Sequence, residues 1–290
     1  MTTHMTHASG IETQAAGDVR LTTLLLARYG ATAPNLDVWN ETLKTVLGHR
    51  SVRHYRPDPL PEGTIELLVA AGQSAASSSN LQAWSVIAVE DSNRKARLAA
   101  LAGEQAQITQ APLFLVWLVD LHRLETIGRL EDSPSEGLQY LESFLLGAVD
   151  ATLAAQNAVI ALESLGLGAV YIGAIRNNPE KVAEELALPP HVFPLFGLTV
   201  GYPDPTIRTA VKPRLSQEAV LFRETYALSE ITETTAFNDY NLRLKHFQTK
   251  QHMPQRNWTE TVARRLHDAA SLHGRDRLAA ALRNMGFGLK

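Results

Sequence analysis

Apolar residues recur along the chain in two periods, which predict helices and strands in alternation. Between Leu36 and Gly48 they return every three or four residues, and Gly48 can end that helix. The same period predicts helices over residues 62–76, 92–106, 137–165 and 176–188. Short apolar or β-branched runs predict strands within residues 84–90, 111–120, 166–175 and 192–204. This order indicates a sheet with helices on both faces.

Two of these segments have more apolar residues than one buried face requires. Residues 111–120, APLFLVWLVD, form a continuous apolar strand of the kind that is buried on both faces. The helix over 137–165 is apolar around most of its circumference, which predicts burial in a core or at a subunit interface. Polar residues interrupt every long apolar run, so we expect that no segment spans a bilayer. The chain should therefore be soluble.

The N-terminal residues are polar and without periodicity. We expect residues 1–35 to form a disordered or helical extension. The stretch LTTLLLARYGATA has the look of an export signal, but its apolar part is short and acidic residues precede it, so we expect a cytoplasmic protein. The length of 290 residues and a hydrophobic content of 45% favour one large domain with a tail.

Composition excludes several kinds of chemistry. With 27 Lys and Arg against 30 Asp and Glu, the net charge of -3 argues against a protein devoted to nucleic acid. The sequence has no cysteine, which excludes disulfides, thiolate metal sites and a cysteine nucleophile. We find no metal-binding histidine spacing, no serine-hydrolase elbow and no Walker A loop. A binding site without catalytic side chains fits a redox enzyme whose cofactor carries the chemistry.

Positive charge is nevertheless concentrated in two places. His49, Arg50, Ser51 and Arg53 follow the end of the first helix, and these donors suit a phosphate group. A solvated basic turn is the alternative. Residues 211–215, VKPRL, add a second basic pair on one face of an extended segment, so the two clusters could bind one anion.

The glycines near residue 170 do not form a dinucleotide-binding loop. Gly166 and Gly168 follow a helix and precede a strand, the reverse of the order that a Rossmann site requires. We expect one of them to take a positive φ as a helix cap. Gly173 lies within the strand pattern, where a missing side chain indicates the close approach of a ligand or another backbone.

The serine-rich segment over residues 74–84 admits two interpretations. Its composition is that of a flexible connector. It also joins a helix directly to a strand, where loops are short and ordered, and its hydroxyls with Asn80 and Gln82 would then line a polar site.

Taken together, the motifs GHRSVRHY, SSSNLQ, LGLGAVYIGAIRNNPE, FPLFGLTVGYP and VKPRL resemble the nitroreductase superfamily, in its branch of oxygen-insensitive major nitroreductases and NADPH-flavin reductases. The resemblance extends from Trp39 to Leu215. It implies an FMN-containing, intertwined homodimer with an α+β three-layer fold around a mostly antiparallel sheet. The FMN-binding core would occupy residues 36–225, and residues 226–290 would complete it and contact the partner subunit.

The resemblance also implies a set of site residues. His49, Arg50 and Ser51 would bind the FMN phosphate with Lys212 and Arg214, while Arg53 would stabilise the reduced flavin near its N1 and O2 atoms. The ring and ribityl chain would contact Ser77, Ser78, Ser79, Gln105 and the backbone of Tyr171, Ile172, Gly173 and Ala174. Ala174 replaces a usual glycine of the family. Candidate NAD(P)H contacts are Arg176, Lys250 and Arg256.

The implied activity is an exchange in two steps, in which NAD(P)H reduces FMN and the FMN then reduces a nitroaromatic, a quinone or free flavin. No catalytic side chain and no metal are expected. An alternative is a dedicated flavin reductase that supplies an oxygenase. Another class remains open, a nucleic-acid or anion-binding protein that uses the basic stretches RLKHFQTK and VARRLH of the tail.

Overall fold

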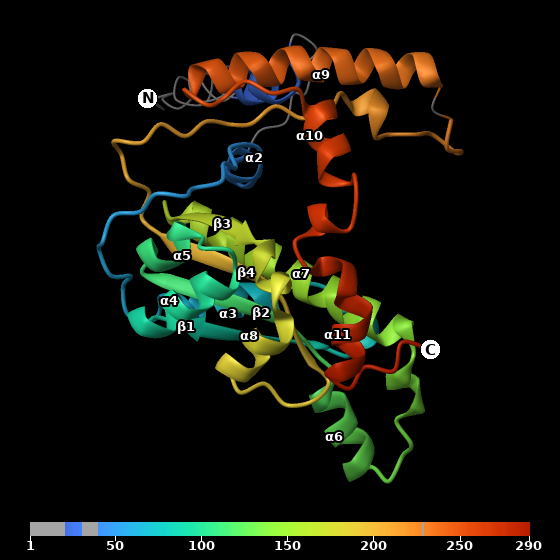
Figure 1. Cartoon of the computed structure of the whole chain (residues 1–290). Coiled ribbons are helices and arrows are strands. Elements are labelled where there is room, and N and C mark those ends of the chain that lie inside the picture. Colours follow the sequence, from blue (N-terminus) through green and yellow to red (C-terminus); the bar gives the residue numbers. More distant parts are fainter. Residues whose placement is uncertain (1–20, 31–39, 228) are drawn as a thin grey trace, which may run out of the picture. The chain divides into compact units, whose positions relative to one another are not determined.

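The computed structural model describes residues 21–30, 40–227 and 229–290 (Figure 1). Contacts divide the chain into two compact units, and each unit combines two stretches of sequence. The first unit takes residues up to Arg50 and residues 208–267. The second takes residues 51–207 and 268–290. The expected cofactor residues therefore belong to both units.

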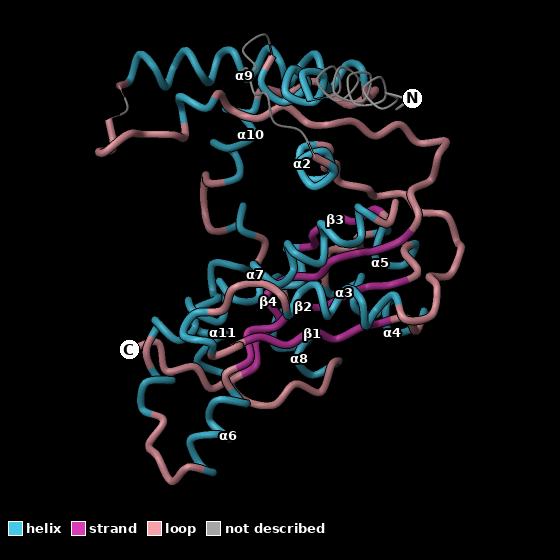
Figure 2. The backbone as a smooth tube through the Cα atoms, turned by 180° about the vertical axis from the view of Figure 1, so that it is seen from behind, coloured by secondary structure: helices cyan, strands magenta, loops and turns pink. Residues whose placement is uncertain are grey.

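The described strands of the second unit form one antiparallel sheet. They are β1 (Trp84–Val89), β2 (Leu113–Asp120), β3 (Gly168–Ile172) and β4 (Val192–Gly201). Their order in the sheet is β1-β2-β4-β3, and each neighbouring pair is antiparallel. With helices on both faces (Figures 1 and 2), this confirms an α+β fold.

The central strand β2 explains why its sequence is apolar throughout. Leu115 and Trp117 pack on one face in a core cluster with α3 and α7, whereas Phe114 and Val116 pack on the other with α4, α5 and α8. Successive side chains of a strand point to opposite faces, so a strand between two helical layers needs apolar residues at every position. The helices are α3 (Thr64–Gln73), α4 (Ser92–Leu101), α5 (Ala106–Gln110), α7 (Leu141–Ser164) and α8 (Pro179–Glu185).

The long helix α7 bears on the expectation that no segment spans a bilayer. By its length and its mean hydropathy of 1.5 alone it could cross a membrane. Its inner face packs into the core against β2 and α3, as in the core helix of a soluble protein. Its outer face exposes apolar side chains, among them Leu145 and Val149.

Several boundaries differ from those expected. The helix expected over residues 36–48 is described from Asn40 onward, because residues 36–39 lie outside the described residues. There α2 (Glu41–Leu47) follows the extended backbone of Asn40, whose side chain caps the helix. Gly103 and Glu104 take positive φ between α4 and α5, so the helix expected over 92–106 is interrupted. The strand expected over 166–175 ends at Ile172, and Gly173 begins a 3-10 helix (Gly173–Asn177).

The C-terminal residues pack into the second unit as part of a third core cluster. Phe287 contacts Phe193 and Phe144 edge to face. The cluster lies near α6 (His122–Leu130) and α11 (Leu278–Asn284). His191 joins these parts, because one ring nitrogen lies 3.0 Å from Glu125 Oε2 and the other 2.7 Å from the Gly286 carbonyl.

The first unit is helical in its described parts. It contains a helix over residues 21–29, α2, α9 (Glu230–Lys250) and α10 (Trp258–Arg265). The Asn241 side chain accepts a hydrogen bond of 2.7 Å from the Trp258 amide, and Tyr240 meets the Trp258 ring edge to face. These contacts fix α10 against α9. Short 3-10 turns elsewhere cover Ser78–Asn80, Glu136–Gln139, Gln217–Ala219, Ala270–Leu272 and Arg275–Arg277.

Candidate functional site

In the first unit, one buried arginine joins the two basic segments. Arg28 is 7% exposed, and its guanidinium donates to the Lys212 carbonyl at 3.0 Å and to the carbonyls of Leu47 and His49 at 2.8 and 3.3 Å. Its own carbonyl accepts from the Arg214 amide at 2.9 Å. The end of α2 and the VKPRL segment, more than 160 residues apart in sequence, therefore lie within reach of one guanidinium.

Helix α9 supports the second basic segment. Arg243 donates to the Arg214 carbonyl at 2.9 Å, and the Tyr240 hydroxyl donates to the Pro213 carbonyl at 3.2 Å. Burial raises the pKa of Tyr240, which keeps its hydroxyl protonated as a donor. Because the carbonyls of this segment are occupied by helix side chains, its backbone is fixed.

The loop after α9 brings Lys250 and Arg256 into one region. The Gln248 side chain is 9% exposed, and it accepts from the Arg256 amide at 3.0 Å and donates to the Arg256 carbonyl at 3.2 Å. This pair of hydrogen bonds folds the loop back onto the last turn of α9, which carries Lys250. Both basic side chains are exposed.

In the second unit, Ser51 and Arg53 lie on a segment that is fixed to the sheet. The Val52 amide donates to the Ala169 carbonyl of β3 at 2.9 Å, and Tyr55 forms a bridge with Pro203. Val52 is buried while Ser51 and Arg53 are exposed on either side of it. This contact also explains Gly168, where a Cβ atom would lie 2.5 Å from Val52 Cγ2. Gly166, with φ of 76°, takes the expected positive φ after α7.

The serine segment forms an ordered loop around a buried carboxylate. Asp150, on α7, is 1% exposed and accepts from the Ser77 hydroxyl at 2.7 Å, the Ser78 amide at 3.0 Å and the Ala83 amide at 3.2 Å. Ser78 and Ser79 are exposed. Ser79, Asn80 and Gln82 all take positive φ, a conformation that costs a non-glycine residue about 1 kcal/mol. The ordered interpretation of this segment is confirmed.

The segment after β3 carries the remaining expected contacts. At Gly173 a Cβ atom would lie 3.4 Å from the Arg176 guanidinium and 3.9 Å from that of Arg275. Arg176 donates to the Leu195 carbonyl, and burial together with the charge of Arg275 lowers its pKa. Ala174 packs against the core cluster of α4 and α8.

Tyr171 and Gln105 complete the expected set in this unit. Tyr171 is 37% exposed, and its ring meets Phe196 edge to face. Ile172 is 3% exposed and packs in the core, so its side chain is not available to a ligand. Gln105 precedes α5 and accepts from the Gln107 side chain at 2.7 Å.

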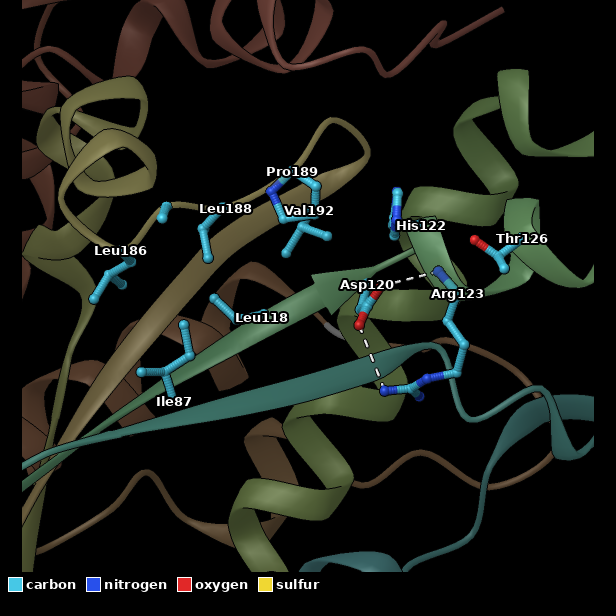
Figure 3. A pocket seen from close by; sticks show the side chains of 11 residues that line it. Ile87, Leu118, Asp120, His122, Arg123, Thr126, Leu186, Leu188, Pro189 and Val192 are labelled. Carbon is cyan, nitrogen blue, oxygen red and sulfur yellow. Dashed lines mark hydrogen bonds and ion pairs between the residues drawn. The ribbon is translucent and has the colours of Figure 1, made fainter.

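A hollow of about 470 Å³ lies on the face of the sheet that α8 covers (Figure 3). Ile87, Leu118 and Val192 form its apolar floor, and Asp120 and Arg123 stand at its polar side. The Arg123 guanidinium also donates to the Gln82 carbonyl at 3.0 Å and to the Ser85 hydroxyl at 2.8 Å. Arg123 therefore binds the serine-rich segment at Gln82, whereas Asp150 binds it at Ser77 and Ser78.

Two supporting residues were not found from the sequence. Asp150 could have been noticed as the one charged residue inside the apolar run of α7 from Phe144 to Leu162, because charged side chains are rarely buried without partners. Arg28 gave no local signal, since it lies in a segment that we interpreted as an extension. Within the described residues, no group of three or more His, Asp or Glu gathers as a metal site.

Comparisons with known proteins identify the family of the chain. The model of the nitroreductase family matches residues 46–202, and that of the nitroreductase family C-terminal domain matches residues 212–290. An FMN reductase [NAD(P)H] of Bacillus subtilis is 42% identical over 227 residues, which cover 77% of this chain and 90% of the relative. An oxygen-insensitive NADPH nitroreductase of Salmonella typhimurium is 43% identical over 185 residues, 64% of this chain and 74% of the relative.

A solved structure is similar to this chain in its fold. The hypothetical oxidoreductase YcnD from Bacillus subtilis superposes with a TM-score of 0.81 at 38% sequence identity. The match covers 87% of this chain and 99% of that structure.

Proposed function

The chain belongs to the nitroreductase family, and on that premise we propose that it is an FMN-dependent enzyme which uses NAD(P)H to reduce nitroaromatics, quinones or free flavin. The names of two relatives, 42 and 43% identical to this chain, support two of these acceptors, since one is an FMN reductase and the other a nitroreductase. The chain covers 90% of the first relative, so the likeness concerns nearly all of that enzyme.

The observation that carries the proposal is the pair of basic segments bound by Arg28. FMN ends in a phosphate dianion, which requires several donors and positive charge at one place. Arg28 fixes the backbone at His49 and at Lys212, and Arg50 and Arg214 adjoin these two positions. Four side chains, His49, Arg50, Lys212 and Arg214, would hold the phosphate, together with Ser51, which follows Arg50 in the chain.

Within the second unit, exposed groups suit a flavin ring and a ribityl chain. The exposed hydroxyls of Ser78 and Ser79 and the side chain of Gln105 are donors and acceptors for the ribityl chain and the ring edge. The bare backbone at Gly173 would permit close approach of a planar ring. The exposed Arg53 would stabilise negative charge on that ring. When bound, FMN supplies a two-electron carrier that takes a hydride from NAD(P)H and passes it to the acceptor.

We propose basic residues as the candidates for binding the co-substrate. Lys250 and Arg256 on the folded loop after α9 would bind phosphates of NAD(P)H, and Arg176 is a further candidate in the second unit. No side chain is assigned as an acid, and the protons for the acceptor would come from solvent or from the cofactor's own groups.

The exposed apolar face of α7 supports a homodimer. Leu141, Leu145, Val149 and Leu153 recur at intervals of four and are 43–54% exposed, an apolar stripe that a monomer would leave in water. We propose that two copies of the chain cover this stripe and that the enzyme acts in the cytoplasm.

A first test of the proposal is the visible spectrum of the purified protein. The protein, as purified or after reconstitution with FMN, is expected to be yellow and to bleach on addition of NADPH or NADH without oxygen. A preparation that remains colourless after incubation with FMN would contradict the proposed function.

A second test addresses the phosphate contacts. In Lys212→Gln/Arg214→Gln the dissociation constant of FMN should rise about tenfold or more, since a charge-assisted hydrogen bond contributes ~1.5–3 kcal/mol. The dissociation constant of riboflavin, which lacks the phosphate, should hardly change. Lys181→Gln, a change at an exposed lysine of α8, is the matched control. Equal losses for FMN and riboflavin would show that these residues do not bind the phosphate.

A further inference from the structure

The position of Asp150 in α7 is unusual for a carboxyl group. It stands one turn from Gly147 and Ala154 in the middle of an apolar helix, and it is 1% exposed. Burial of such a group is unfavourable unless donors surround it. Neither the proposed phosphate contacts nor the expected ring contacts give it a function.

Asp150 accepts hydrogen bonds from one segment, which we define as the serine loop, residues 77–83. One carboxylate oxygen accepts from the Ser78 amide, and the other accepts from the Ser77 hydroxyl and the Ala83 amide. The Ser77 oxygen in turn accepts from the Gln82 amide at 2.8 Å. The carboxylate therefore joins the beginning of the loop to its end.

The close approach of α7 makes these contacts possible. At Gly147 a Cβ atom would lie 3.1 Å from the Ala83 carbonyl and 2.6 Å from Val119 Cγ1. A side chain there would push the helix away from the loop. Asp150, three residues further along the same helix, then reaches the Ala83 amide from the same side.

The loop needs such support because its backbone is unfavourable by itself. Three non-glycine residues, Ser79, Asn80 and Gln82, have φ of 49°, 55° and 51°. Such conformations persist where the surroundings fix them. The other support is Arg123, which donates to the carbonyls of Gln82 and Trp84 at 3.0 and 3.3 Å.

We propose that Asp150 is a positioning residue that holds the serine loop in the conformation in which Ser78 and Ser79 receive the flavin, an inference that rests on the proposed function. Ser77 has a different role from its two neighbours. Its hydroxyl donates to Asp150 and accepts from Gln82, so it completes the support of the loop, and Ser78 and Ser79 offer their hydroxyls to the ligand.

The test compares Asp150→Asn with Asp239→Asn, a change at an exposed carboxylate of α9. The amide of asparagine has one oxygen in place of two, so either the Ser78 amide or the Ser77 hydroxyl with the Ala83 amide loses its acceptor and faces an NH2 donor. The dissociation constants of FMN and riboflavin should both rise at least about tenfold in Asp150→Asn and in the same ratio, because the loop is assigned to the ribityl chain and ring. Asp239→Asn should match the wild type.

Amide hydrogen exchange of the protein without flavin supplies a readout independent of activity. Ser78, Gln82 and Ala83 should exchange faster in Asp150→Asn, while the amides of β2 keep their protection. Ser77→Ala should reproduce both effects, and Ser77→Thr, which keeps the hydroxyl, should restore flavin binding. The serine variants also test the proposal if Asp150→Asn does not fold.

Two outcomes separate this inference from the function on which it rests. If the wild type binds flavin and both Asp150→Asn and Ser77→Ala bind it with unchanged dissociation constants, Asp150 serves stability alone and the inference is wrong. If the wild type binds neither FMN nor riboflavin, the proposed function fails and this inference fails with it.

Discussion

At the scale of single residues, Tyr55 shows how one side chain anchors a segment that carries expected site residues. Its hydroxyl donates to the Val52 carbonyl at 2.7 Å and lies 2.7 Å from Thr199 Oγ1, a residue of β4. Burial raises the pKa of Tyr55, against the weaker opposing effects of Thr199 and Arg53. The folded protein therefore keeps this proton at a pH where the unfolded chain loses it.

This difference predicts a loss of stability in alkali. Between the ordinary tyrosine pKa near 10 and the raised value in the folded state, the folded protein binds more protons, so the free energy of unfolding falls as pH rises. Tyr55→Phe should lower the free energy of unfolding by about 1 kcal/mol at pH 7, because its hydrogen bonds are lost. Above pH 10 this free energy should fall less in the variant than in the wild type. Urea unfolding from pH 7 to 11 measures both.

The exposed Tyr226 provides the control for this measurement, because Tyr226→Phe changes a hydroxyl that is open to water. The free energy of unfolding of Tyr226→Phe should fall with rising pH as much as that of the wild type. Burial also raises the pKa of Tyr171 and Tyr240, so some decline remains in Tyr55→Phe. An unchanged decline in Tyr55→Phe would argue against burial of the Tyr55 hydroxyl.

At the scale of elements, a bidentate ion pair joins α8 to the turn before α11. The Arg277 guanidinium lies 2.6 and 2.8 Å from the two Glu180 oxygens, and it holds the pKa of Glu180 below its ordinary value. Both side chains are partly exposed, at 44 and 30%, so solvent screens much of this interaction.

We expect Glu180→Gln to lower the free energy of unfolding by about 0.5 kcal/mol at neutral pH. The contribution of a carboxylate with a lowered pKa is present above its unfolded pKa and is lost as pH falls through the folded pKa. The melting temperatures of the wild type and Glu180→Gln should therefore converge in acid, as the pH falls below the ordinary glutamate pKa of 4.5. Glu184→Gln, at an exposed position of the same helix, should show no such convergence. A difference in melting temperature between the wild type and Glu180→Gln that stays constant across the pH range would contradict a contribution of this ion pair to stability.

At the scale of the whole molecule, the outer face of α7 predicts assembly. Val149→Asp places a charge in the middle of the exposed apolar stripe and should convert a dimer to a monomer in size-exclusion chromatography with light scattering. Leu130→Asp, at a leucine of α6 that is 79% exposed, should leave the dimer intact. A wild type that elutes as a monomer, or a Val149→Asp variant that stays dimeric, would contradict the proposed interface.

Patterns within a single element were predictable. The continuous apolar run of β2 indicated burial on both faces, because each face of the sheet carries a helical layer. The positive φ at Gly166 followed from a helix that ends before a strand. Boundaries were predicted less well, since Asn40 and Gly103 act through local backbone conformations that an apolar period does not register.

The candidate site was predictable only in part. The resemblance supplied its residue types, and their assigned roles stay predictions. The reason why Gly168 is a glycine came from Val52, more than 100 residues earlier in the chain. Likewise, the polar character of Asp150 is visible in the sequence, but its partners are not, because nothing local indicates that Ser77 and Ala83 pack against its helix.

The sequence by itself determined a sheet with helices on both faces, the absence of cysteine chemistry and the two concentrations of basic residues, because composition and period report the burial and charge of each segment; the α+β class came from the family resemblance. The tertiary structure decided which segments meet. Arg28 joins the end of α2 to the VKPRL segment, and Asp150 fixes the serine loop. Such hydrogen bonds connect residues far apart in the chain, so their geometry depends on the packing of whole helices and strands, and a local pattern does not encode it.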